Sequence, residues 1–260
     1  MFDDKDPTAA PEEARRQADR DARERMNVWD RNGSLRGLRI GVPREYFPAE
    51  LSLDVSERVR EVVSGLQARG ATVVPVSLPS TAYALSAYYV LASAEASSNM
   101  ARYDGVQYGL QVRPPRGVVG KAGRVYAHTR MAGFGREVQK RVLLGTYALV
   151  ADAYDNYFLQ AQRVRQLVQA DFDSVFILPD HLHQRGGVQG GVDVLVHASA
   201  IGPALALDGE PGLGAYVQDV LTVPASLAGL PVVSVPSGVS VAGQWGSEAA
   251  VLRVAEIVGE

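Results

Sequence analysis

The stretch LRIGVPREYFPAELSLDVSERVREVVSGLQARGATVVPVSL, residues 38–78, decides the fold. Its first six residues predict a short strand that ends at a proline. Asp54 followed by Glu57 has the spacing of a capping box, in which an N-cap acceptor precedes a glutamate by three positions. An apolar stripe at helical spacing follows, made of Val59, Val62, Val63 and Leu66. The sequence therefore predicts a helix that begins near Asp54 and ends at Gly70.

A second strand is predicted at residues 71–78, where Pro75 indicates an edge position or a bulge. Strand, helix and strand in this order predict a βαβ unit. Further helices are expected at 81–102, 136–176 with an interruption near Gly145, 224–228 and 248–258, and further strands at 192–196 and 232–235. This alternation predicts an α/β fold whose mixed, mainly parallel sheet is flanked by helices. The excess of helices over strands suggests that part of the sheet is missing.

Composition excludes several classes of protein. The chain has 260 residues, no cysteine, and 26 basic against 29 acidic side chains, which gives a net charge of −3. A protein that binds nucleic acid through counterion release normally carries a basic excess or patch, and none is visible here. Without cysteine, disulfides, thiolate zinc sites and cysteine nucleophiles are all absent. No apolar run approaches the roughly 20 residues that a membrane-spanning helix needs.

Residues 1–35 differ in composition from the rest of the chain. Of the first 31 residues, 16 are charged, and acidic and basic side chains alternate along the segment. Residues 11–26 could form a solvated helix with ion pairs at i,i+4 spacing, but almost nothing there is apolar enough to dock it. We therefore expect residues 1–35 to be a charged, disordered tail and residues 36–260 to form one folded domain. The tail matches neither a mitochondrial transit peptide nor a secretory signal.

Catalytic motifs are scarce. His181 and His183 share a glycine-rich segment, 179–191, that is expected to be a flexible surface loop, but no third metal ligand stands at a suitable spacing. Ser97 and Ser98 lie in an alanine- and serine-rich helix, and they lack the nearby glycines that usually build an oxyanion hole, so packing is their expected role. No nucleophile elbow, P-loop or dinucleotide fingerprint is present. From the residues alone, the chain offers no complete catalytic constellation.

Several segments nevertheless resemble one family. AYYVLASAEASSN at 87–99, RVLLGTY at 141–147 and TVPASLAGLP at 222–231 are similar to the A subunits of glutamyl-tRNA(Gln) amidotransferases, which are amidase-signature hydrolases. Residues 38–47, 74–79, 102–105 and 133–135 extend the resemblance, and DNYFLQAQRVR at 155–165 with DFDSVF at 171–176 is closest to the fungal mitochondrial form. The similarity runs from about residue 36 to 239 and corresponds to the family's C-terminal half. It implies a partial amidase-signature fold from which the strands of the catalytic half are missing.

The resemblance also implies a function and its parts. The complete subunit would be a glutaminase that supplies ammonia for Gln-tRNA(Gln) formation in the mitochondrial matrix. The family's Ser-cisSer-Lys triad lies upstream of anything in this chain, whose lysines are Lys5, Lys121 and Lys140. We therefore expect no amide hydrolysis by the isolated chain. No cofactor is expected in it, because the partner subunit would bind the tRNA and use ATP and Mg²⁺. The expected partners are the other subunits of the complex and glutamine, with tRNA only indirectly and no membrane.

Three residues fall on the family's glutamine-contacting positions: Tyr88, Arg141 and Asp219. A free amino acid is a zwitterion, so its pocket needs a cation for the carboxylate and an anion for the ammonium group. The planar guanidinium of arginine can bind a carboxylate in a bidentate manner. Taken alone, the same residues are more typical of a core tyrosine and of surface or ion-paired charges. The resemblance favours the ligand role for all three.

The chain departs from the family at two places. Residues 194–203 replace a Thr/Pro-rich strand end, and residues 239–246 shorten a strand, which is expected to expose a sheet edge or an apolar face. These departures favour a truncated or mis-assembled reading frame or a diverged remnant, with a genuine split subunit as an alternative. A catalytically dead binding or assembly module is a second alternative. A fragment of another amidase-signature hydrolase is a third, although an uncharged amide substrate would not need both Arg141 and Asp219.

Overall fold

A computed structural model describes residues 3, 5–6, 8–30, 34–113, 122–204 and 214–259. The chain forms two compact units. Unit 1 comprises Met1–Leu85 together with Arg165–Glu260, and unit 2 comprises Ser86–Val164. The helical segment in the middle of the chain makes most of its contacts within itself, and the expected folded domain over residues 36–260 stays a prediction.

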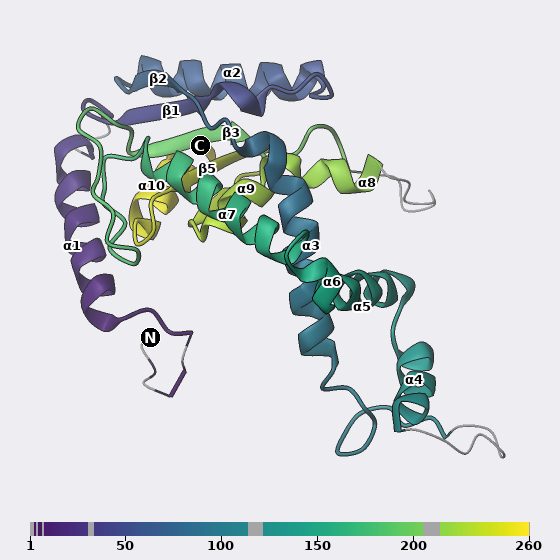
Figure 1. Cartoon of the computed structure of the whole chain (residues 1–260). Coiled ribbons are helices and arrows are strands. Elements are labelled where there is room, and N and C mark those ends of the chain that lie inside the picture. The colour runs from purple at the N-terminus through teal and green to yellow at the C-terminus, as the bar shows by residue number, and fades with distance from the viewer. Residues whose placement is uncertain are drawn as a thin grey trace. The chain divides into compact units, whose positions relative to one another are not determined.

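Unit 1 is built on a five-stranded sheet in the order β2-β1-β3-β5-β4 (Figure 1). The strands are β1 (Arg39–Pro43), β2 (Thr72–Val76), β3 (Val194–Ala198), β4 (Val232–Ser234) and β5 (Val239–Gly243). Pairing is parallel from β2 through β1 to β3 and antiparallel from β3 through β5 to β4. The α/β class and the mixed sheet flanked by helices are confirmed, with parallel pairing in half of the sheet.

The βαβ unit forms as predicted, with one change at the start of its helix. Helix α2 (Leu53–Ala68) connects β1, through the short 3₁₀ helix η1 (Arg44–Tyr46), to the parallel strand β2. Its N-cap is Ser52, whose hydroxyl accepts a hydrogen bond from the Val55 amide, so the helix starts before the predicted cap at Asp54. A serine hydroxyl caps a helix as well as an aspartate carboxylate does. Pro75 lies in the edge strand β2, which confirms the predicted edge position.

The segment expected to carry a shortened strand with an exposed edge or face forms a fully buried strand. Strand β5 is buried along its whole length and lies between β3 and β4. Its small and β-branched residues suit a strand that is covered on both faces. Helix α10 (Glu248–Gly259) follows and packs against β4 and β5. Residues 239–246 therefore continue the sheet rather than expose it.

The amino-terminal segment also differs from the expected disordered tail. Helix α1 (Glu12–Trp29) packs against α10, and it buries Ala18, Ala22 and Trp29. Arg25 donates two hydrogen bonds to Asp193, with Nε 2.6 Å from Oδ1 and Nη2 3.0 Å from Oδ2. Ala18 and Ala22 are small, so neighbouring main chain can come close to this face of α1. At Gly246 the approach is so close that a Cβ added to the glycine would overlap the Cβ of Ala18. Close approach of small residues, together with an ion pair, docks a helix that has few large apolar side chains.

Unit 2 contains most of the helices in the middle of the chain. They are α3 (Thr81–Met100), α4 (Ala122–Gly133), α5 (Arg136–Ala148), α6 (Ala151–Tyr154) and α7 (Phe158–Asp173), of which α3 begins and α7 ends in unit 1. The expected long helix breaks on either side of α6 rather than near Gly145. Gly145 lies inside α5 at a point where a Cβ would overlap the main chain of Ser93 on α3, so this glycine permits close helix packing instead of ending the helix.

The remaining segments of unit 1 are short. The glycine-rich segment 179–191 is largely exposed, and it packs closely at Gly187 and Gly191, where a Cβ would overlap the main chain between residues 175 and 178. Asp180 is buried there and accepts hydrogen bonds from the amides of Leu182 and His183. Helix α8 (Gly214–Val217), the 3₁₀ helix η2 (Gln218–Leu221) and α9 (Val223–Ala228) precede β4, and α9 ends as predicted at Gly229, whose φ is +80°.

Candidate functional site

Two of the three predicted ligand-binding residues lie close together in unit 2. Tyr88 and Tyr89 stand on α3 with their rings edge to face at a centroid distance of 5.2 Å. Arg141 on α5 places the carbon of its guanidinium 5.5 Å from the centroid of the Tyr89 ring. All three side chains are half-buried. The structure therefore joins Tyr88 and Arg141, which are 53 positions apart in sequence, through a tyrosine that the sequence reasoning did not assign.

The packing of α3 against α5 explains this arrangement. Gly145 lets the two helices approach closely at Ser93, and Arg141 and Tyr89 each lie one turn earlier on their helices. Residues four apart on a helix share a face, so the close contact one turn away directs the arginine toward the tyrosine. Ser97 Oγ and Thr146 Oγ1 form a further link between the helices at 3.1 Å. The sequence signals for this arrangement were the adjacent tyrosine pair and the resemblance that selected Tyr88 and Arg141, and neither indicated the contact between Arg141 and Tyr89.

The electrostatics of Arg141 suit an anionic ligand. Among the described residues, no carboxylate forms a salt bridge with Arg141, and its guanidinium lies over the ring of Tyr89. A guanidinium over an aromatic ring is held by the ring's quadrupole, and this interaction leaves its N–H donors in the guanidinium plane unused. Such a group can bind a carboxylate through two parallel hydrogen bonds.

Asp219 lies in unit 1, in the 3₁₀ helix η2, and is exposed. Its backbone carbonyl accepts hydrogen bonds from the amide and the hydroxyl of Thr222. Within the part of the chain that the structure describes, its carboxylate has no salt-bridge partner. This acid is thus available to a cationic group, and it belongs to a different unit from Tyr88 and Arg141.

The other candidate residues have structural contacts. Ser97 contributes to helix packing, as expected. His181 Nε2 lies 2.7 Å from Asp21 Oδ2 on α1, and His183 Nδ1 lies 2.6 Å from Asp180 Oδ2. No group of three His, Asp or Glu side chains among the described residues is placed to hold a metal ion. The His181 contact therefore links the loop to α1, and the His183 contact links two residues within the loop.

A further histidine, His197 on β3, is enclosed in the core of unit 1. Its Nδ1–H donates to the carbonyl oxygen of Ala198 at 2.8 Å, and the Tyr46 ring meets its ring edge to face at 4.8 Å. Burial lowers the pKa of His197 to about 4, because the charged imidazolium would lose its hydration there. The side chain is neutral at pH 7, so it serves packing.

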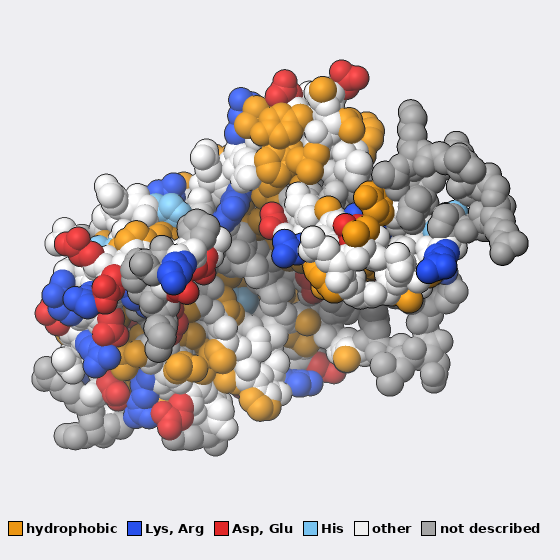
Figure 2. Space-filling model, turned by 90° about the horizontal axis from the view of Figure 1, so that it is seen from below, with side chains coloured by type: hydrophobic (Ala, Val, Ile, Leu, Met, Phe, Trp, Pro, Cys, Tyr) orange, Lys and Arg blue, Asp and Glu red, His pale blue; other side chains and the backbone are white. Residues whose placement is uncertain are grey.

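The described surface carries charges of both signs and exposed hydrophobic side chains (Figure 2). Among the described side chains on the face drawn in Figure 2, acidic and basic groups are interspersed without an extended basic area, and hydrophobic side chains form one broad area with charged groups around it and smaller areas elsewhere. None of the described helices combines the length and the apolar character that a membrane crossing requires.

Comparison with known proteins gives a consistent result. The model of the amidase family matches residues 5–246. The A subunit of the mitochondrial glutamyl-tRNA(Gln) amidotransferase from Mycosarcoma maydis is 49% identical over 97% of this chain and 50% of its own length, and the Podospora anserina protein of the same name is 41% identical over 99% and 56%. The chain thus spans about half the length of the curated relatives it matches.

Solved structures also match. The crystal structure of the A subunit of the glutamyl-tRNA(Gln) amidotransferase from Thermotoga maritima is 29% identical, with a TM-score of 0.56 over 85% of this chain and 42% of that one. A vestigial complex related to an s-triazine catabolic enzyme has a TM-score of 0.63 at 18% identity, over 99% of this chain and 48% of that one, which is a likeness of fold.

Proposed function

The chain belongs to the amidase family, and from this premise we propose that it is the glutamine-holding part of the A subunit of a glutamyl-tRNA(Gln) amidotransferase. The observation that carries the proposal is the unpaired guanidinium of Arg141, held over the Tyr89 ring beside Tyr88. It provides a cation that has no carboxylate partner among the described residues, on a surface that also offers aromatic contact area. A small molecule with a carboxylate matches that combination.

In the proposed function, Arg141 is the cation that binds the α-carboxylate of glutamine, and Asp219 keeps, from the resemblance alone, the role of the anion for the α-ammonium group. Tyr88 contacts the aliphatic part of the ligand. Each charged group of the zwitterion then meets an opposite charge, which offsets the cost of removing it from water. A glutamine held at its α-substituents has its side-chain amide free to be presented to a nucleophile.

The nucleophile and its base are proposed to lie in the part of the family's domain that this chain does not contain. The sequence has no Gly-Gly-Ser-Ser-Gly-Gly motif and no lysine followed by the family signature. The isolated chain is therefore proposed to bind but not to hydrolyse glutamine. In the assembled enzyme, the released ammonia would serve Gln-tRNA(Gln) formation on a partner subunit that binds the tRNA and uses ATP and Mg²⁺. The names of the relatives support a mitochondrial site of action.

The surface of unit 2 supports a place within a larger assembly. Soluble monomers rarely expose a contiguous group of large apolar side chains, and such groups commonly mark interaction surfaces. Between the end of α5 and the start of α7 the exposed large apolar residues are Leu143, Leu144, Tyr147, Leu149, Val150, Tyr154 and Tyr157.

An amidotransferase assembled with this chain tests the proposal. Arg141→Ala is expected to raise the KM for glutamine by about 10- to 100-fold, the scale of a lost charge-assisted hydrogen-bond pair, and Arg141→Lys should recover part of the loss. Product formation from an ammonium salt in place of glutamine should stay at the wild-type level. Arg136→Ala, on the same helix, is the matched control and should leave the KM unchanged.

Unchanged glutamine kinetics in Arg141→Ala would remove the assignment. If the chain joins its partner subunits but no substitution at Tyr88, Arg141 or Asp219 alters ammonia release, the alternative of a binding or assembly module is favoured instead. Glutamine-dependent ammonia release by the purified chain, above that of a Ser97→Ala, Ser98→Ala control, would contradict its expected inactivity.

A further inference from the structure

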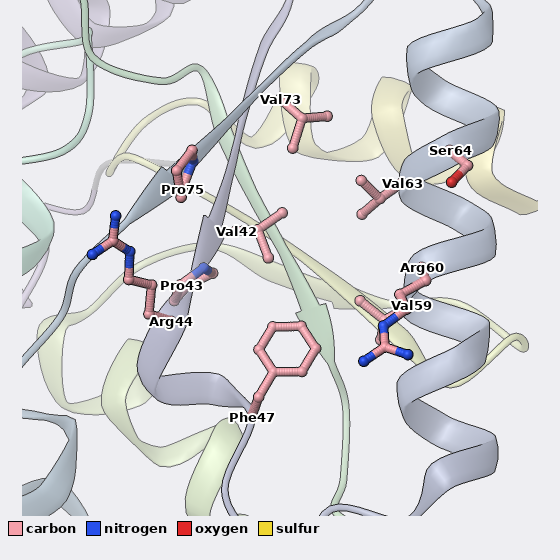
Figure 3. Close-up of a pocket in the computed structure, with 10 residues that line it drawn as sticks. All are labelled: Val42, Pro43, Arg44, Phe47, Val59, Arg60, Val63, Ser64, Val73 and Pro75. Carbon is pink, nitrogen blue, oxygen red and sulfur yellow. The ribbon is translucent and has the colours of Figure 1, made fainter.

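A hollow of about 600 Å³ lies in unit 1 between α2 and the β1–β2 end of the sheet (Figure 3). It contains none of the candidate glutamine-binding residues. Most of its lining is apolar: Val42, Pro43, Phe47, Val59, Val63, Val73 and Pro75. Its volume is in the range of ligand-binding sites, and it lies near the carboxyl ends of two parallel strands, where open α/β sheets commonly bind their ligands.

Strand register and helix spacing account for this lining. Val42 is paired with Pro75 in the parallel register, so these residues and Val73, two positions before Pro75, share one face of the sheet. Val59 and Val63, four apart on α2, form the facing wall. Helix α2 also packs against β3 and β5, nearer the middle of the sheet, so the face at the β2 edge is incompletely covered.

The rim of the hollow carries a cation. Arg60 and Ser64 are four apart on α2, adjacent to the two valines, and Figure 3 shows the Arg60 guanidinium directed toward Phe47. In the part of the chain that the structure describes, Arg60 has no salt bridge or hydrogen bond. The guanidinium of Arg44 points away from the hollow past Pro75 in the same view. One unpaired guanidinium beside an apolar trough therefore complements an apolar group with a neighbouring carboxylate.

The apolar surface extends beyond the hollow. Phe47 is 38% exposed at its end, and Leu53, at the start of α2, is 79% exposed. Small-molecule sites bury most of their ligand, whereas this hollow opens to solvent and continues into exposed apolar side chains. Protein interfaces, in contrast, combine an apolar centre with a polar rim in which arginine is common.

We infer that the hollow between α2 and β1–β2 is a docking site for a segment of a partner subunit, which inserts an apolar side chain against Phe47 and Val63 and places a neighbouring carboxylate on Arg60. This inference rests on the proposed function, since it takes the chain to be one subunit of an amidotransferase. It adds a contact surface separate from the glutamine-binding residues. The segment is recognised by its chemistry, an apolar residue beside an acidic one.

Two measurements on the complex assembled from this chain and its partner subunits test the inference. Arg60→Glu is expected to weaken the affinity of the chain for those subunits by at least about tenfold, because a guanidinium–carboxylate contact becomes a like-charge contact. Arg58→Glu is the matched control and should stay within about twofold of wild type. Arg58 is another exposed arginine of α2, it forms no salt bridge with any described residue, and it does not line the hollow. A benzoylphenylalanine at Ser64 should crosslink to a partner subunit, and one at Glu57 should not.

The inference requires both results. Wild-type affinity of Arg60→Glu, or a Ser64 crosslink that stays within this chain, overturns it. Arg60-dependent binding of decanoate to the isolated chain, without a crosslink in the complex, overturns it in favour of a small carboxylate ligand. In either case the glutamine kinetics of Arg141→Ala stand as a separate result, so the proposed function is judged independently. If the wild-type chain does not join the partner subunits at all, the proposed function fails and the docking site fails with it.

Discussion

Acidification should weaken unit 1 through one side chain, His197. The imidazole is completely buried beside Tyr46, and burial lowers its pKa to about 4, whereas in an unfolded chain it would titrate near its ordinary value of about 6.5. Between these values the unfolded chain binds a proton that the folded chain excludes. The stability contributed by the neutral histidine is therefore complete above about pH 6.5 and declines as the pH falls toward 4.

The magnitude follows from the two pKa values. At pH 5 most of the unfolded histidine is protonated and most of the folded histidine is not. This difference lowers the free energy of unfolding by about 2 kcal/mol relative to pH 7, and the full loss, near pH 4 and below, is about 3 kcal/mol. Losses of this size are a large fraction of the stability of an ordinary domain.

Urea unfolding at pH 7, 6 and 5 measures the effect. Trp29 and Trp245, the chain's two tryptophans, both lie in unit 1, so their fluorescence reports on the unit that contains His197. His197→Gln removes the titrating group, and its stability should depend on pH less steeply than wild type, by about 2 kcal/mol between pH 7 and pH 5. His128→Gln, in unit 2, is the control and should keep the wild-type dependence. Equal pH dependence in wild type and His197→Gln would refute the reasoning.

Two further predictions concern helix packing and a buried ion pair. Gly145→Ala should lower the free energy of unfolding of unit 2 by about 1–2 kcal/mol, because the added Cβ would overlap the α3 backbone. Gly65→Ala has open space around the added Cβ and should raise the free energy of unfolding by about 0.5–1 kcal/mol through the higher helix propensity of alanine. Thermal unfolding followed by circular dichroism measures both changes. Arg25→Ala should cost about 2–3 kcal/mol and expose α1 to proteolysis, because it leaves the buried Asp193 without its cation. Arg23→Ala, which removes an exposed ion pair, should cost less than about 0.5 kcal/mol, and equal protease sensitivity of the two variants would contradict this account.

The sequence predicted the elements whose signals are local. The βαβ unit carries its own apolar periodicity, and its terminators at Pro43 and Gly70 lie within the segment, so the strands and the helix formed close to the predicted positions. The predicted start of α2 at Asp54 was wrong because Ser52 is the N-cap in the structure. Both residue types are good N-caps, and only the folded backbone selects between them. The complete burial of strand β5 was not predicted, because it depends on the neighbouring strands at both of its edges.

The docking of α1 and the meaning of Gly145 could not be predicted from the sequence. An alanine stripe without large apolar residues is read as solvated, yet Ala18 and Ala22 are buried because a partner surface comes close enough to meet them. A glycine in a helix is read as a break, yet Gly145 is where α3 and α5 come into contact. The burial of the two alanines and the role of Gly145 both depend on which segment packs against them, and the sequence pattern does not contain that information.

For the candidate site, too, some features could be predicted from the sequence and others only from the tertiary structure. Residue type and resemblance selected Tyr88, Arg141 and Asp219 from the sequence, since the charges of an amino acid limit which side chains can hold it. Tertiary structure alone supplied the Tyr89 ring under Arg141 and the hollow beside Arg60, because both arise from helix and strand faces that are distant in sequence. The sequence by itself thus determined the family, the local elements and the chemical types at the site. The close approach of backbones decided which of those groups meet, because contact between distant segments depends on packing rather than on the order of residues.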